Sequence, residues 1–273
     1  MKANTIVRIL SFLSAIIVSA FFIALIWNIF SKGFSDFSLS FILDNPTKGG
    51  REGGVFPILM STALIVTVCI AISTSMGLGS AIFLSEFTKH FPKLGNIIRR
   101  CLEILAGVPS IVFGLFGSAF FCIYLEMGFS ILAGGLTLAC MILPLTIRAA
   151  EEGLRQVPDS YRINSLALGI SKRATVFRIL IPAAMPSLVV ALVLGIGRAL
   201  SETAALLFTS GYVLRTPESL LDSGRSLSVH IYDLSMNVPG GESKAYASAL
   251  TLIIVLFFIN TLSSGLTKRW LRN

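Results

Sequence analysis

Six long apolar stretches, separated by shorter segments that carry nearly all of the charged residues, make up most of this chain. A helix rises about 1.5 Å per residue, so roughly 20 apolar residues cross the hydrocarbon core of a bilayer. The pattern therefore predicts an all-α, polytopic membrane protein with six transmembrane helices, forming one domain over residues 1–273. The expected spans are about 9–30, 57–85, 104–123, 127–147, 183–210 and 245–267.

The composition agrees with this prediction and excludes a soluble globular domain. Hydrophobic residues make up 54% of the chain, charged residues 13%, and the mean hydropathy is +0.83. The first apolar run follows Lys2 and Arg8 and exceeds the core of about 7–15 residues that is typical of a secretory signal peptide. We therefore expect this run to remain in the protein as the first span.

The distribution of positive charge predicts the orientation in the membrane. If the N- and C-termini are cytoplasmic, fifteen of the 22 Lys and Arg residues lie inside, six lie outside, and Arg198 alone falls within a span. This asymmetry follows the positive-inside rule. The net charge of +8 therefore reflects topology, and because the basic residues are scattered over several segments, no nucleic-acid partner is expected.

Cysteine and histidine give no sign of a metal site. The four cysteines lie in or beside apolar runs without a C-x-x-C pair, and we interpret them as small apolar side chains: Cys69, Cys101, Cys122 and Cys140. His230 has no second His, Cys or carboxylate at metal-ligand spacing, so an interfacial or hydrogen-bonded role is expected. The chain also lacks a G-x-x-x-x-G-K-[ST] loop and a catalytic cluster, so it is not expected to be an enzyme.

Pro109 interrupts the third span and leaves two interpretations open. A proline within a helix removes a backbone hydrogen bond, and the neighbouring glycines allow close helix approach, so a bent, tightly packed helix is expected. Alternatively, Pro109 marks the point where the helix begins.

The longest cytoplasmic connection, residues 149–182, predicts two short helices. Asp159 or Ser160 can cap the first, Gly169 can end it, and Ser171 can cap a second helix that runs to Pro182. Its apolar residues alternate with basic ones, which suits contact with both membrane helices and a partner. A solvated basic loop is the alternative interpretation.

The fifth span carries the only polar constellation expected at membrane depth: Arg198, Ser201, Glu202 and Thr203. Arg198 and Glu202 are four residues apart, so they share one face of a helix. A charge near the middle of a bilayer is costly unless it faces a partner charge or a water-filled path. A row of small residues beside them, from Ser187 to Thr203, offers a face for close packing. An anion permeation site and a structural ion pair both fit these residues.

The stretch from Gly169 to Pro182 resembles the cytoplasmic loop signature of the permeases of binding-protein-dependent ABC importers, and nearly the whole chain shares the likeness. Gly169, Ile179 and Pro182 keep the family spacing, Ile181 replaces a Leu, and residues 163–165 (I-N-S) replace the family's E-A-A. The resemblance implies a type I ABC importer permease fold and an ATPase-coupling loop over residues 149–182. The implied coupling residues are Tyr161, Arg162, Ala167, Leu168, Gly169, Ser171, Lys172, Ile179 and Pro182.

Three further stretches are similar to the permeases of phosphate importers. Residues 105–117 resemble their third-span motif, and residues 198–205 (R-A-L-S-E-T-A-A) resemble R-A-x-G-E-T-A-A with Ser201 in place of the Gly. Residues 226–232 look like an outer-loop segment of the A-type subunit, which we expect at the outer interface. The resemblance implies import of inorganic phosphate by alternating access, with Arg198, Ser201, Glu202 and Thr203 along the substrate path.

The same resemblance implies the partners and the location. These are a homologous permease, two ATP-binding subunits that hold ATP and Mg²⁺, a periplasmic phosphate-binding protein, and the lipid of a bacterial inner membrane. The chain itself is expected to carry no cofactor and no metal. Four alternatives stay open: a permease for sulfate, molybdate or phosphonate, the C-type phosphate permease, an ATP-independent channel or secondary transporter, and a non-transporting scaffold.

Overall fold

The computed structural model describes residues 2–88 and 91–270, with side chains described for residues 7–88 and 91–265. Lys89 and Arg272, which were counted among the cytoplasmic cations, lie outside the described residues, as do the side chains of Lys2, Lys268 and Arg269. The elements are, in order, α1 (Lys2–Gly33), α2 (Leu39–Leu43), β1 (Pro46–Thr47), η1 (Lys48–Gly50), β2 (Glu52–Gly53), α3 (Phe56–Ile82), η2 (Phe83–Phe87), α4 (Pro92–Ala106), α5 (Ser110–Gly117), η4 (Ser118–Tyr124), α6 (Ile131–Arg155), α7 (Asp159–Ala167), α8 (Lys172–Thr175), η5 (Val176–Leu180), α9 (Ile181–Leu200), α10 (Ala204–Leu207), α11 (Leu227–Met236) and α12 (Glu242–Trp270).

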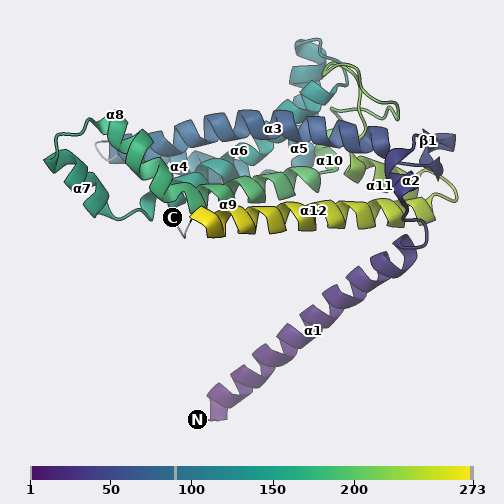
Figure 1. Cartoon of the computed structure of the whole chain (residues 1–273), viewed down its shortest axis with the longest axis horizontal. Helices are drawn as coiled ribbons and strands as arrows, with labels where there is room; N and C mark the ends of the chain where they lie inside the picture. The colour runs from purple at the N-terminus through teal and green to yellow at the C-terminus, as the bar shows by residue number, and fades with distance from the viewer. Residues whose placement is uncertain (1, 89–90, 271–273) are drawn as a thin grey trace.

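Long helices running along a common axis form the bundle (Figure 1). Among the described residues, five helices are long and apolar enough to cross a membrane, and a bent pair, α4 with α5–η4, raises the number to six. The helices α7 and α8 lie at one end of the bundle. They belong to the predicted ATPase-coupling loop, and we call them the coupling segment. The β1–β2 hairpin, in which Pro46 pairs with Gly53, lies with α2 and α11 at the other end.

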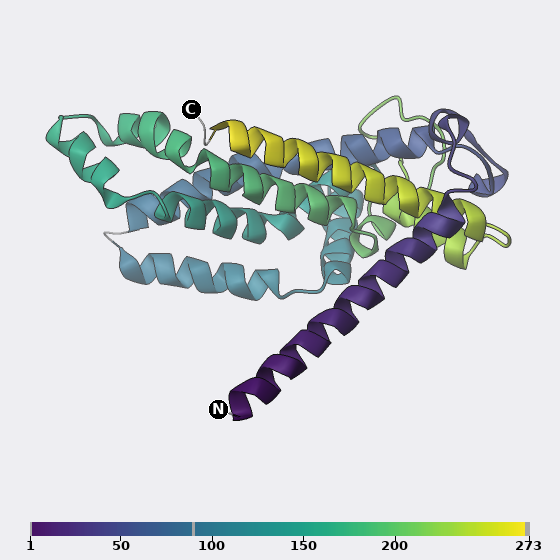
Figure 2. The ribbon, with the colours of Figure 1, turned by 60° about the horizontal axis from the view of Figure 1, so that its bottom comes forward.

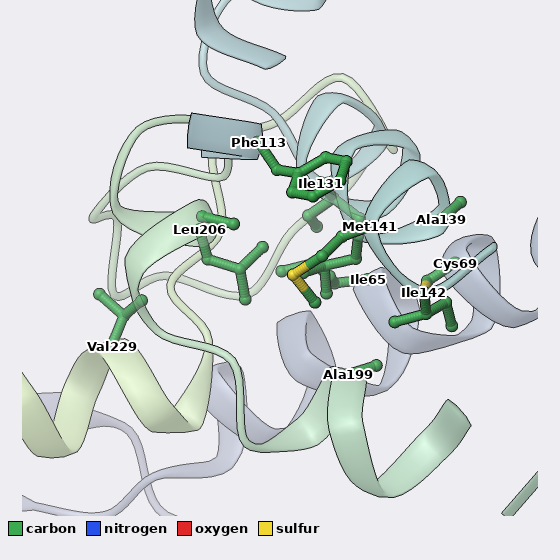
Figure 3. Packing of buried hydrophobic residues seen from close by; sticks show 12 residues of the cluster. Ile65, Cys69, Phe113, Ile131, Ala139, Met141, Ile142, Ala199, Leu206 and Val229 are labelled. Carbon is green, nitrogen blue, oxygen red and sulfur yellow. The ribbon is translucent and has the colours of Figure 1, made fainter. Parts of the chain in front are cut away.

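The largest core cluster forms where α3, α5, α6, α9, α10 and α11 meet (Figure 3). Ile65 and Cys69 enter it from α3, and Met141 and Ile142 enter it from α6. Cys122 is also buried, whereas Cys101 is exposed on α4. Lipid tails are as apolar as these side chains, so van der Waals packing, rather than removal from water, holds the helices together at this cluster.

The predicted third span is wrong as a single helix over residues 104–123. The chain forms α4 and α5–η4, which meet at an angle of 95°, and Figure 2 shows the second helix turning away from the first. Pro109 is the N-cap of α5, so it marks a helix start, as the alternative interpretation held. Because the residue before a proline avoids the helical conformation, Val108 separates the two helices.

The predicted fifth span is also wrong at both ends. An uninterrupted helical run from Lys172 to Leu200 passes through Pro182, which therefore does not end a helix. The π-helical turn η5 lies immediately before Pro182, and such a turn can accommodate the proline ring and its missing N–H. At its C-terminal end the helix stops at Leu200, and α10 begins only at Ala204.

The helix α11 covers the segment that was expected at the outer interface, and most of its apolar side chains are buried within the chain. Leu227, Val229, His230 and Leu234 are buried, and the helix packs against α3 and α12. The N–H of Leu227 donates to Oγ1 of Thr62 in α3 at 2.9 Å. The helix α11 is therefore part of the bundle, at the end opposite α7 and α8.

The first helix, α1, leaves the bundle at an angle in both views (Figures 1 and 2). None of its most apolar window is buried within the chain. Contact is made at its C-terminal end, where Gly33 lies directly against the backbone of Tyr246 in α12. A side chain larger than hydrogen at position 33 would collide with that backbone.

Candidate functional site

The end of α9 is defined by local hydrogen bonds. The backbone N–H of Ser201 donates to the carbonyl of Gly197 at 3.2 Å, and the Ser201 hydroxyl donates to the same carbonyl at 2.9 Å. A serine that bonds back in this way competes with helix continuation. Three residues, Ser201 to Thr203, therefore separate α9 from α10.

Arg198 and Glu202 meet at this break in very different surroundings. The Arg198 side chain is 56% exposed, the Glu202 side chain is 8% exposed, and Nη2 of Arg198 lies 3.9 Å from Oε2 of Glu202. This distance is too long for a hydrogen bond, so the two charges attract without being locked together. An exposed guanidinium next to a buried carboxylate can exchange that partner for an oxyanion.

Glu202 is fixed by neighbours on two other elements. Its Oε1 accepts a bond from the N–H of Ala205 in α10 at 3.4 Å, and its backbone carbonyl accepts a bond from the hydroxyl of Ser228 in α11. Ser201 is exposed, and Thr203 is half-buried at the start of α10 without a side-chain cap. The structure thus gathers the four predicted residues at one helix break.

The two faces of α9 differ as the sequence predicted. In the row of small residues, Ala191, Gly195 and Ala199 are buried, and Ser187 lies close against Gly153 of α6. Val190 and Leu194 are exposed in one row with Arg198, each four residues from the next. An apolar cavity of about 270 Å³ lies between α9, α3 and α6, lined in part by Thr74, Thr146, Met185 and Leu188.

The coupling segment presents apolar side chains outward from α7. Leu166 is 78% exposed and Leu168 is 76% exposed. Tyr161 and Ile163 are exposed beside them, whereas Ser165 is buried. An exposed apolar patch of this kind marks an interaction surface.

The predicted turn at Gly169 and the predicted cap of α8 are present, whereas the predicted cap of α7 is not. Gly169 has a φ of +68°, which suits the turn between the two helices. Ser171 caps α8 by accepting a bond from the N–H of Ala174 at 3.3 Å. For α7 the cap prediction was wrong, because Pro158 occupies the N-cap and Asp159 is the first helical residue. Of the other coupling residues, Ala167 and Pro182 are exposed and Ile179 is half-buried.

Arg162 points inward from α7 and joins it to two membrane helices. Its Nη2 donates to Oε1 of Glu86 at 2.6 Å and to the carbonyl of Leu154 at 3.0 Å, and its Nη1 donates to the carbonyl of Val157 at 2.9 Å. The hydrogen bond and charge of Glu86 raise the pKa of the Arg162 guanidinium above its ordinary value, so this cation is permanent.

Glu86 escaped the sequence analysis, as did the pair between Arg99 of α4 and Glu151 of α6, joined at 2.8 Å. Glu86 directly follows the apolar run of the second span and precedes several Lys and Arg residues. A carboxylate at the end of an apolar run could have identified Glu86 as a candidate for an ion pair. Its partner lies 76 residues away, so sequence spacing could not identify the pair.

Comparison with known proteins supports the family that the sequence resembles. A family model described as "Binding-protein-dependent transport system inner membrane component" matches residues 73–271. The probable ABC transporter permease protein YqgI of Bacillus subtilis is 31% identical, over 95% of this chain and 91% of the relative. The phosphate transport system permease protein PstA 2 of Mycobacterium bovis is 33% identical, over 81% of this chain and 74% of the relative.

A solved structure supports the fold. A chain of the MetNI methionine ABC transporter, in an inward-facing conformation, matches with a TM-score of 0.63 and covers 78% of this chain and 94% of its own length. The sequence identity is 16%, so the likeness concerns the fold alone.

Proposed function

Because this chain belongs to the family of binding-protein-dependent transport system inner membrane components, we propose that it is a permease subunit that imports inorganic phosphate. The family assignment makes it a multi-pass membrane protein and a transport component rather than an enzyme. A permease of this family acts with ATPase and substrate-binding partners. The names of its relatives support phosphate as the substrate.

The observation that carries the proposal is the loose pair of Arg198 and Glu202 at the break after α9. A guanidinium offers planar, paired donors that match a phosphate oxyanion. Glu202 holds Arg198 when no substrate is present, and phosphate replaces it during passage. One cation with a competing carboxylate binds the anion weakly enough to release it, as conduction requires. Ser201 and Thr203 lie beside this path.

Energy enters through residues 149–182. The exposed apolar side chains of α7 fit a cleft of an ATPase subunit, and α8, η5 and α9 continue from there as one helical run to Arg198. The cavity between α9, α3 and α6 leaves room for α9 to shift. Closure of the ATPases on ATP would then switch the path between outward and inward access.

The proposed complex contains this chain, a homologous permease, two ATPase subunits that bind ATP and Mg²⁺, and a periplasmic phosphate-binding protein. The N- and C-termini are proposed to be cytoplasmic in a bacterial inner membrane. Two features support this orientation: the distribution of positive charge, and the position of the end of α12 beside α7–α8 (Figure 1).

The test is phosphate uptake by the assembled complex in liposomes, with Arg198→Gln as the variant. Loss of a charge-assisted contact worth about 1.5–3 kcal/mol should reduce uptake by about tenfold or more, while assembly is unchanged. Arg215→Gln is the matched control, because Arg215 is an exposed arginine of the outer loop that lies 4.0 Å from Asp222.

Three results would contradict the proposal. Normal uptake by Arg198→Gln favours a scaffold or a structural ion pair. Uptake that persists without the ATPase subunits indicates a channel or secondary transporter. Sulfate or molybdate that competes better than phosphate indicates a different oxyanion.

A further inference from the structure

We propose that the buried ion pair of Glu86 and Arg162 is the joint through which the coupling segment moves α3, with Glu86 as a positioning residue. This inference rests on the proposed function, since it concerns how ATP-driven movement spreads within the permease. It assigns a role to a residue that directly follows the second predicted span, away from the loop signature and the substrate path.

The geometry of the pair is that of a rigid connection. Nε of Arg162 lies 3.1 Å from Oε1 and 3.2 Å from Oε2 of Glu86, and Nη2 lies 2.6 Å from Oε1. The side chains are 15% and 7% exposed, respectively. Breaking such a pair leaves an uncompensated buried charge, so the two groups are expected to move together.

The pair connects more than two elements. Arg162 also donates to the carbonyl of Leu154 in α6 and to that of Val157, just after α6, so one side chain of α7 connects to both α6 and η2. Lys172, the first residue of α8, donates to the backbone carbonyl of Glu86 at 3.0 Å. Residues at the start of both helices of the coupling segment therefore hold the same residue of η2, the turn that continues α3.

The local structure of η2 explains why α3 can be held there. Glu86 lies in a π-helical turn, and a widened turn of this kind alters the usual helical hydrogen-bond ladder. The carbonyl of Glu86 accepts the Lys172 ammonium, and the carbonyl of Leu84 accepts Nη2 of Arg99 at 3.1 Å. Lys172 also lies 4.2 Å from the centre of the Phe87 ring.

The direct helical run from α8 to α9 can move only the Arg198 side of the path. The pair adds a second route, through which a displacement of α7 also pulls on α3, which lines the opposite side of the apolar cavity. The α9 wall and the α3 wall of the apolar cavity would then move in one step. The inward direction of Arg162 leaves the apolar face of α7 free for the ATPase.

The experiment measures ATP hydrolysis by the complete complex, without and with the binding protein loaded with inorganic phosphate. The variants are Glu86→Gln, Arg162→Gln, the double variant, and the charge-conserving Glu86→Asp. The matched control is Arg148→Gln, which breaks another Arg–Glu pair, with Glu103, that lies outside the coupling segment. Assembly is quantified first for every complex.

We expect Glu86→Gln and Arg162→Gln to lower the stimulation of hydrolysis by at least about fivefold, the lower end of typical coupling between two sites. Basal hydrolysis and assembly should remain normal for Glu86→Gln. The double variant should be no worse than either single one, because both remove the same interaction. Glu86→Asp should recover part of the stimulation, and Arg148→Gln should retain all of it.

Normal stimulation in both single variants would overturn the joint, and so would effects that add in the double variant. Loss of assembly in the single variants would also overturn it, by showing that the pair only supports the fold. A wild-type complex that phosphate fails to stimulate would instead contradict the proposed function, so the two failures can be told apart.

Discussion

His230 is a fully buried histidine in α11, packed between the side chain of Arg225 and the turn at Gly50. Burial, and then the nearby Arg225 charge, lower its pKa to about 3. An unfolded chain binds a proton at this histidine below about pH 6.5, whereas the folded chain does not until about pH 3. Acidification between these values therefore favours unfolding.

We expect this group to lower the free energy of unfolding by up to about 1.4 kcal/mol per pH unit between pH 6.5 and 3. His230→Asn should weaken this dependence, because the asparagine does not titrate. Thermal unfolding of the purified complex in detergent at pH 7 and pH 5 provides the measurement. An identical change for wild type and variant would show that other groups cause the acid sensitivity.

The close approach of α5 and α6 depends on Gly117, the last residue of α5. A methyl group there would collide with the side chain of Thr137 in α6, which is fully buried and donates to the carbonyl of Ala133 at 2.7 Å. Gly117→Ala should destabilise the protein by about 1–3 kcal/mol, as overpacking does.

Gly79→Ala in α3 is the control for this substitution, since nothing lies within 4 Å of the added methyl group. It should leave the melting temperature unchanged or raise it slightly, because alanine favours a helix over glycine by about 0.5–1 kcal/mol. Equal melting temperatures for both variants would show that α5 can shift away from α6.

The sequence predicted those parts of the helices that depend on local chemistry. Ser171 as a cap and the buried small row of α9 follow from neighbouring residues and helical spacing. Pro109 indicated a bend or a helix start, but the separate helix α4 and the 95° angle were not predicted, because apolar composition carries no information about helix direction. The Glu86–Arg162 pair depends on how α3 meets α7, which is a property of the folded bundle.

At the scale of the whole molecule, the proposed orientation places the β1–β2 hairpin outside and the start of α4 inside. In a variant whose four cysteines are replaced, a single Lys48→Cys should react with a membrane-impermeant thiol reagent in right-side-out vesicles. A single Lys93→Cys should react only in inverted vesicles. Both positions are exposed, so burial cannot hide the result. The reverse labelling would place the N-terminus outside.

The break after α9 makes Arg198 and Glu202 members of two different moving parts. Arg198 travels with a helical rod that begins at Lys172, about 39 Å away at roughly 1.5 Å per residue, while Glu202 is attached to α10 and α11. A tilt of about 5° over that rod displaces Arg198 by roughly 3 Å. The distance between these two charges, 3.9 Å in this structure, would thus change with the tilt of α9. A movement of α8 at one end of the bundle would alter the contact between Arg198 and Glu202 at the other end.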